Sequence, residues 1–124
     1  MSKISVLVAD DDSHMMQYYH AILDKADDIR MVAATTVCSR VLFLVQEMTP
    51  DIVLIDYAMI PIDGFQLMAN IHAEFPETPV ILLGGRKHLR SSAIEKGAAD
   101  YLPVPITPRN LIDAIQRIGK KKPL

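Results

Sequence analysis

Five short apolar runs recur along the chain, and the longer segments between them have a different periodicity. The runs at 4–9, 52–55 and 80–83 are nearly continuous in valine, isoleucine and leucine. This pattern is typical of strands that are buried on both faces of a parallel sheet. The runs at 31–35 and 101–104 are more mixed in composition. Together the runs predict five strands, at Ile4–Ala9, Met31–Thr35, Ile52–Ile55, Val80–Leu83 and Tyr101–Val104.

The segments between the predicted strands carry apolar residues at helical spacing. A short, weakly patterned segment at Leu89–Lys96 predicts a further helix. Thr107 followed by Pro108 predicts the N-cap and the first position of the last helix. The clear apolar stripes are Met15, Tyr19, Ile22, Leu23 and Ala26; Val41, Leu44, Val45 and Met48; Met68, Ile71 and Phe75; and Leu111, Ile115 and Ile118.

Strand and helix signals alternate five times, which predicts an α/β fold with a doubly wound parallel sheet and helices on both faces. Pro103 lacks the backbone N–H that a central strand needs, so the fifth strand is expected at an edge. The flavodoxin-like strand order 2-1-3-4-5 places it there. We expect one domain over residues 1–119, followed by a basic tail or linker stub at 120–124.

Composition and charge narrow the class of protein. The chain has 124 residues, of which 50% are hydrophobic and 23% charged, and this is the composition of one globular domain. The net charge of -2 argues against binding to nucleic acid or an anionic membrane. Cys38 is the single cysteine and cannot form an internal disulfide. With no signal peptide and no apolar stretch near the roughly 18 residues of a membrane span, we expect a cytoplasmic protein.

Acidic residues follow two of the predicted strands. The first strand runs into Asp10, Asp11 and Asp12, and the third ends at Asp56. Ligands of such sheets bind beyond the carboxyl ends of the strands, at the switch point beside strand one, so we expect Asp10, Asp11 and Asp56 in one pocket. Clustered carboxylates repel one another unless a cation lies among them, and Mg²⁺ prefers such oxygen ligands. Asp12 is expected to cap the following helix.

These motifs resemble the receiver domains of bacterial two-component systems. The run 6–12, VLVADDD, is similar to the first strand and acidic pair of that family. The run 50–56, PDIVLID, followed seven residues later by Asp63-Gly64, is similar to its phosphoacceptor strand and loop. The resemblance covers essentially the whole chain. It implies that Asp56 accepts a phosphoryl group from a phosphohistidine of a sensor kinase or phosphotransfer protein.

The resemblance also implies a metal site and a backbone feature. Asp11 and Asp56 would bind Mg²⁺ directly, with the backbone carbonyl of Ala58 as a third ligand and Asp10 acting through water. The Val104–Pro105 bond would be cis. The chain has no GxGxxG, Walker or Ser/His nucleophile motif, so we expect no enzymatic activity beyond assistance to its own aspartyl phosphorylation.

Some positions depart from the family pattern. Gly84 stands where the family has a hydroxyl residue at the end of strand four, and Val104 stands where it has a lysine. In Met59–Pro61 the proline is displaced by one position. In the family the hydroxyl moves toward the phosphate, and the aromatic residue at the Tyr101 position then turns inward. With Gly84 an empty volume is left, into which Tyr101 could settle permanently.

Two hypotheses follow from these departures. In the first, Asp56 is still phosphorylated, and Arg86 or Lys87 substitutes for the lost lysine unless that loop is simply solvated. In the second, the domain has lost switching and works as a phosphorylation-independent interaction module. The family's output face corresponds to residues 88–119 and would dock a homodimer mate or an effector. This face carries Arg90, Lys96, Tyr101, Arg109 and Arg117.

A remote alternative belongs to another class that shares this fold. Asp12-Ser13-His14 is partly similar to the Asp-x-His-x-x-Gly motif of cobalamin-binding domains, and Gly84-Gly85 to their later glycine pair. Gln17 stands where the motif has glycine, so His14 is expected on the surface at the start of the first helix.

Overall fold

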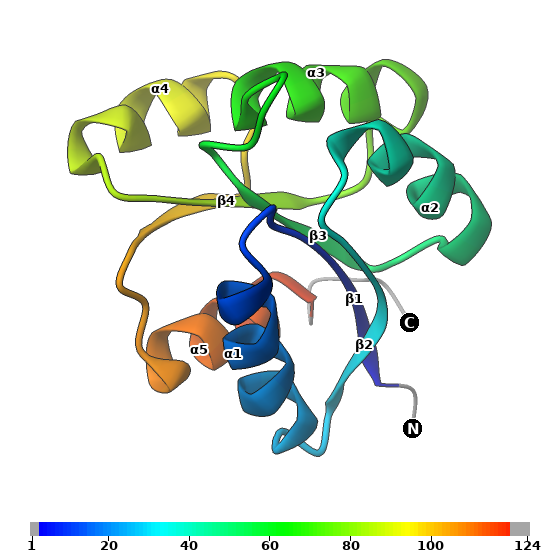
Figure 1. Ribbon diagram of the computed structural model, residues 1–124, viewed down its shortest axis with the longest axis vertical. Coiled ribbons are helices and arrows are strands. Elements are labelled where there is room, and N and C mark those ends of the chain that lie inside the picture. The colour runs from blue at the N-terminus through cyan, green and yellow to red at the C-terminus, as the bar shows by residue number, and fades with distance from the viewer. Residues whose placement is uncertain (1–2, 120–124) are drawn as a thin grey trace.

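The computed structural model describes residues 3–119, so the predicted tail at 120–124 lies outside the described residues. Its centre is a parallel five-stranded sheet in the order β2-β1-β3-β4-β5 (Figure 1). The doubly wound fold and the edge position of the strand that contains Pro103 are therefore confirmed. The strands are β1 (Ile4–Ala9), β2 (Ile29–Thr35), β3 (Ile52–Asp56), β4 (Val80–Gly84) and β5 (Asp100–Pro103).

Helices cover both faces of the sheet (Figure 1). One face carries α1 (Ser13–Asp24) and α5 (Pro108–Gly119). The other carries α2 (Val41–Met48), α3 (Gly64–Glu74) and α4 (Arg90–Glu95). Short 3-10 turns at Cys38–Arg40 and Lys87–Leu89 precede α2 and α4. Within residues 3–119, none of these helices has the length and apolar character needed to cross a bilayer.

Alternate residues of the central strands enter two separate cores. Val8 and Leu54 pack with α1 and α5, whereas Leu7 and Val53 pack with α2, α3 and α4. All four side chains have no exposed surface. Burial on both faces explains why the central strands are continuous apolar runs rather than alternating ones.

Four of the five strands differ in their bounds from the prediction, and β3 and β4 each end only one residue later, at Asp56 and Gly84. β2 begins at Ile29 rather than at residue 31, because buried Ile29 pairs with Ile4. The exposed Arg30 interrupts the apolar run and hides this start in the sequence. β5 is Asp100–Pro103 rather than 101–104, because Asp100 joins the ladder opposite Ile81 and is buried despite its charge.

The helices show further differences from the predicted stripes. The predicted helix at 89–96 begins two residues earlier, with a 3-10 turn at Lys87, and its α-helical part is only six residues long. Met48 is 40% exposed, since α2 buries Val41 and Val45 instead, and Ala26 lies beyond the end of α1. The predicted cap of α5 is confirmed, since the Asn110 N–H donates to the Thr107 hydroxyl at 3.1 Å.

The loops at the carboxyl ends of β1 and β3 are fixed by aspartate caps. Asp12 caps α1 as expected, by accepting the His14 N–H at 2.9 Å, and Asp63 caps α3 by accepting the Gln66 N–H at 3.0 Å. Gly64 follows this second cap, and a Cβ on it would lie 2.8 Å from the Cα of Tyr57. Glycine at 64 therefore lets α3 start against the residue that follows Asp56.

Candidate functional site

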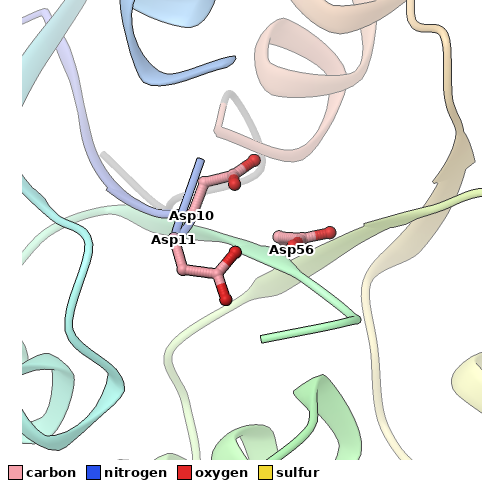
Figure 2. A group of neighbouring side chains, drawn as sticks. All are labelled: Asp10, Asp11 and Asp56. Carbon is pink, nitrogen blue, oxygen red and sulfur yellow. The ribbon is translucent and has the colours of Figure 1, made fainter. Parts of the chain in front are cut away.

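Three aspartates meet beyond the carboxyl ends of β1 and β3 (Figure 2). Ala9 lies opposite Ile55 in the parallel ladder, so the two strands end at the same level. Asp10, Asp11 and Asp56 each offer a carboxylate oxygen, and these oxygens lie within 4.8 Å of one another. Among residues 3–119 this is the one such group that could hold a metal ion. The structure thus brings together the three side chains that the sequence predicted to share a pocket.

Asp10 is the most buried of the three, at 3% exposed. Its Oδ1 accepts the Asp12 N–H at 2.9 Å. Burial raises the pKa of Asp10 from 3.8 to about 6, with the charges of Asp56 and Asp11 adding to the shift. The Asp12 N–H and the Tyr19 hydroxyl act in the opposite direction. From the sequence, Tyr19 was assigned only to the apolar stripe of α1. Helical periodicity shows which face a residue lies on, but not that the Tyr19 hydroxyl reaches Asp10.

Asp56 is half-buried, and Asp11 is exposed at the mouth of the group. Burial raises the pKa of Asp56; the backbone N–H of Ala58 opposes this, and the charges of Asp11 and Asp12 add to it. Carboxylates raise one another's pKa where no nearby positive charge balances their negative charges. Such a donor set fits a hard divalent cation such as Mg²⁺.

Stability without metal is expected to depend on pH through Asp10. Its folded-state pKa of about 6 lies above the ordinary 3.8, so the stability linked to its proton is fully present below pH 3.8 and lost as the pH rises through 6. With a chelator present, the free energy of unfolding of Asp10→Asn relative to that of wild type should therefore increase between pH 4 and pH 7. Urea unfolding of both proteins across this range measures it. A constant difference would contradict the raised pKa.

Magnesium is expected to offset the loss of stability that accompanies ionisation of Asp10, because a bound cation favours the ionised carboxylates. At pH 7.5 the wild-type protein should gain stability on addition of Mg²⁺, and the gain should shrink below pH 6. Asp10→Asn should gain less at every pH. The same urea titrations with and without Mg²⁺ provide the comparison, and an equal gain in both proteins would contradict a role of Asp10 at the metal.

The position of Gly84, at the end of β4, is filled from β5. Tyr101 lies opposite Leu82 in the ladder and is only 1% exposed. A Cβ on Gly84 would overlap the Tyr101 hydroxyl and would lie 3.0 Å from its Cζ. The hydroxyl is buried and has no hydrogen-bond partner among residues 3–119. Tyr101 therefore occupies the volume that a side chain at residue 84 would need.

The other departures from the family pattern lie around the same strand ends. The Val104 N–H donates to the Gly84 carbonyl at 2.9 Å, and the Val104–Pro105 bond is cis. Arg86 and Lys87 are exposed. The charge of Arg86 acts on the Tyr101 hydroxyl, but neither cation is among the influences on the pKa of Asp56. A contact of Arg86 or Lys87 with a phosphoryl group on Asp56 stays a prediction.

The face formed by α4, β5 and α5 has fewer unpaired positive charges than the sequence predicted. Asp100 is 4% exposed and accepts Arg90 Nη2 at 2.8 Å on one oxygen and Arg117 Nη2 at 2.7 Å on the other. These two arginines are therefore paired with a buried carboxylate, and Tyr101 is buried instead of lying on the face. Arg109 and Lys96 are exposed, and Lys96 Nζ lies 5.5 Å from the centre of the Phe65 ring on α3.

The chain is a doubly wound α/β domain with aspartates grouped at the ends of β1 and β3, and this combination is typical of receiver domains. Residues 6–116 match the family model of the response regulator receiver domain. The chain belongs to this family and is a receiver domain of two-component signal transduction. Receiver domains bind Mg²⁺ at an acidic pocket, and the chain has the corresponding aspartate cluster.

Similar proteins cover the chain almost completely. The chemotaxis protein CheY of Listeria monocytogenes is 29% identical over 119 residues, which are 94% of this chain and 99% of that protein. The receiver domain of Francisella response regulator 1452 superposes with a TM-score of 0.87 at 26% identity, over 96% of this chain and 98% of that one. The signal receiver domain of NarL from Mycobacterium tuberculosis shares the fold, with a TM-score of 0.90 at 24% identity over 98% and 100% of the two chains.

Other relatives are longer than this chain. A protein-glutamate methylesterase/protein-glutamine glutaminase of Methanococcus maripaludis is 30% identical over 125 residues, which are 98% of this chain but 33% of that protein. The chain spans a third or less of this relative and of the next two curated relatives. His14 lies on the surface as expected, with 92% of its side chain exposed, and the family match does not support the cobalamin alternative.

Proposed function

We propose that Asp56 is the phosphoacceptor of this receiver domain and that a phosphohistidine of a sensor kinase or phosphotransfer protein is the donor. The observation that carries the proposal is the grouping of Asp10, Asp11 and Asp56 within 4.8 Å at the carboxyl ends of β1 and β3. Asp56 is half-buried in this group, so part of the residue remains reachable from solvent. The proposed location is the cytoplasm, where such kinases present their phosphohistidine.

In the proposed reaction an Asp56 carboxylate oxygen attacks the phosphorus atom. A P–O bond forms, the P–N bond to the histidine breaks, and the electron pair of that bond leaves with the imidazole. The product is an acyl phosphate on Asp56. In the loose transition state of phosphoryl transfer, negative charge is spread over the three equatorial oxygens. The protein therefore acts mainly by positioning the reactants and by stabilising this charge electrostatically.

Asp10, Asp11, Asp56 and the backbone carbonyl of Ala58 would hold Mg²⁺ in this proposal. When bound, Mg²⁺ supplies positive charge against the phosphoryl oxygens and the surrounding carboxylates. The protein's part is to keep the oxygens in place. The Asp12 N–H holds Asp10 at 2.9 Å, and the Ala58 N–H acts on the Asp56 carboxylate.

Acetyl phosphate provides the direct test of Asp56. With Mg²⁺, intact-mass measurement should find wild-type protein carrying one added phosphoryl group, and Asp56→Asn should carry none. Asp63→Asn is the matched control, because asparagine also caps a helix and Asp63 caps α3 from the same loop. Absence of the adduct in wild type, or equal labelling of Asp56→Asn, would refute the assignment.

A second candidate function is a phosphorylation-independent interaction module. The position of Tyr101 favours it, because this ring is already buried in the volume left by Gly84 before any phosphoryl group is present. The face of α4, β5 and α5 would then dock a homodimer mate or an effector constitutively. Beryllofluoride with Mg²⁺ should shift amide signals near Asp56 and leave α5 unchanged. Large shifts along β5 and α5 would argue for a working switch.

A further inference from the structure

One buried side-chain polar atom in residues 3–119 has no partner at hydrogen-bond geometry, and it is the hydroxyl of Tyr101. The Arg86 backbone N–H acts on its oxygen as a donor, so the hydroxyl lacks an acceptor for its own proton. A buried hydroxyl without a partner loses its hydration without replacement, which is unfavourable for folding. Phenylalanine would fill the same volume without this cost. An unsatisfied group of this kind therefore needs an explanation, and a catalytic or binding role is one of the recognised ones.

The strand register brings this hydroxyl to the acidic site. Asp56 lies opposite Leu83, and the Tyr57 N–H donates to the Leu83 carbonyl at 2.8 Å. Gly84 is the next residue of β4, and a Cβ on it would lie 3.3 Å from Tyr57 Cβ and overlap the Tyr101 hydroxyl. The hydroxyl therefore reaches the end of β4 from β5, beside the residue that follows Asp56.

Electrostatics keep this hydroxyl a donor. Burial raises the pKa of Tyr101, and the Arg86 backbone N–H and charge oppose the rise. Tyr57 and, as the smallest influence, the negative charge of Asp56 add to it. The hydroxyl thus keeps its proton at neutral pH and can donate it to an acceptor. A phosphoryl group on Asp56 would bring further negative oxygens into the space beyond the carboxylate.

We propose that the Tyr101 hydroxyl donates a hydrogen bond to an oxygen of the phosphoryl group on Asp56, in place of the hydroxyl that residue 84 lacks. This inference rests on the proposed function, since it needs Asp56 to carry the phosphoryl group. The donor is supplied from β5 rather than β4, and it is in place before phosphorylation. Phosphorylation then provides the partner that the buried hydroxyl lacks.

Binding of beryllofluoride with Mg²⁺ tests the hydrogen bond without requiring a kinase. Tyr101→Phe removes the hydroxyl and retains the ring. A hydrogen bond to a charged group corresponds to a change of about 10- to 100-fold in affinity, and we expect Tyr101→Phe to bind beryllofluoride more weakly by this factor. Tyr18→Phe is the matched control, because its hydroxyl donates to the Ile106 carbonyl at 2.8 Å, and it should bind as wild type does.

A rescue variant separates the hydroxyl from its position in the chain. Gly84→Ser in the Tyr101→Phe background supplies a hydroxyl from β4 after the tyrosine oxygen has been removed, and it should restore most of the affinity. The ultraviolet spectrum gives a second readout, because hydrogen bonding of a phenol changes its absorption. Beryllofluoride should produce a tyrosine difference spectrum in wild type that is weaker in Tyr101→Phe, where only Tyr19 and Tyr57 remain near the aspartates.

The outcomes distinguish this inference from the proposed function. If wild type binds beryllofluoride and takes a phosphoryl group from acetyl phosphate, and folded Tyr101→Phe binds with equal affinity, the role of Tyr101 is refuted while Asp56 stands. The same conclusion follows if Tyr101→Phe is weaker but the serine rescue fails and the difference spectrum is as strong in Tyr101→Phe as in wild type. If wild type does neither, the function of Asp56 is refuted and the inference with it.

Discussion

Gly84→Ala is expected to lower the free energy of unfolding by about 1–3 kcal/mol, the range found when buried sites are overpacked. The new Cβ would overlap the Tyr101 hydroxyl and lie 3.0 Å from Cζ. The tyrosine is 1% exposed, so its ring cannot give way without leaving the core. Urea unfolding measures the loss. Solvent accessibility of the tyrosine should rise in the same variant.

Two comparisons make this prediction specific. Gly85→Ala is the matched control, because its Cβ would meet only Val104 Cγ2 at 3.8 Å, an ordinary contact, and its stability should change little. Tyr101→Phe alone should be neutral or stabilising, since it removes a buried hydroxyl without a partner. In the Tyr101→Phe background, Gly84→Ala should be less harmful by about 1 kcal/mol. Strict additivity would show that residues 84 and 101 do not compete for one volume.

Asp100→Ala is expected to lower the free energy of unfolding by about 2 kcal/mol. The buried carboxylate links α4 to α5 through Arg90 and Arg117, and one oxygen also accepts the Tyr101 N–H at 2.8 Å. Charge-assisted bonds are stronger than neutral ones, but both arginines are more than half exposed, so solvent weakens these pairs. Urea unfolding at pH 7 measures the loss, with Asp113→Ala on exposed α5 surface as the control.

The effect of Asp100 should depend on pH with a defined sign. Burial alone would raise the pKa of Asp100, but the bonds from Arg117, the Tyr101 N–H and Arg90 outweigh burial and hold the pKa below its ordinary 3.8. The contribution is therefore present above pH 3.8 and lost as the pH falls through the folded-state pKa. The gap between wild type and Asp100→Ala should narrow under acid. A gap that widens below pH 4 would contradict the pairing.

The sheet and the acidic site were predictable from sequence because both depend on local patterns. Strands buried on two faces are read directly as apolar runs, and the switch point of a doubly wound sheet places Asp10 and Asp56 side by side. The cap at Thr107 and the edge position of Pro103 have equally local causes, a side-chain hydroxyl and a missing N–H. Each of these features was found where it was predicted.

The features that sequence missed depend on contacts between distant residues. Arg90 and Arg117 look like free surface cations in the sequence, and only the packing of α4 and α5 beside β5 brings both to Asp100. The start of β2 was missed because Arg30, which is exposed, breaks the apolar pattern. The empty volume at Gly84 could be anticipated, but the direction of the Tyr101 hydroxyl depends on how β5 packs beside β4.

The most direct measurement is a crystal structure grown with Mg²⁺ and beryllofluoride. We expect Mg²⁺ among Asp10, Asp11, Asp56 and the Ala58 carbonyl. We also expect beryllofluoride on an Asp56 oxygen, with the Tyr101 hydroxyl in hydrogen-bond contact with a fluorine atom. An empty aspartate pocket under these conditions, with Asp56 unmodified, would contradict both expectations.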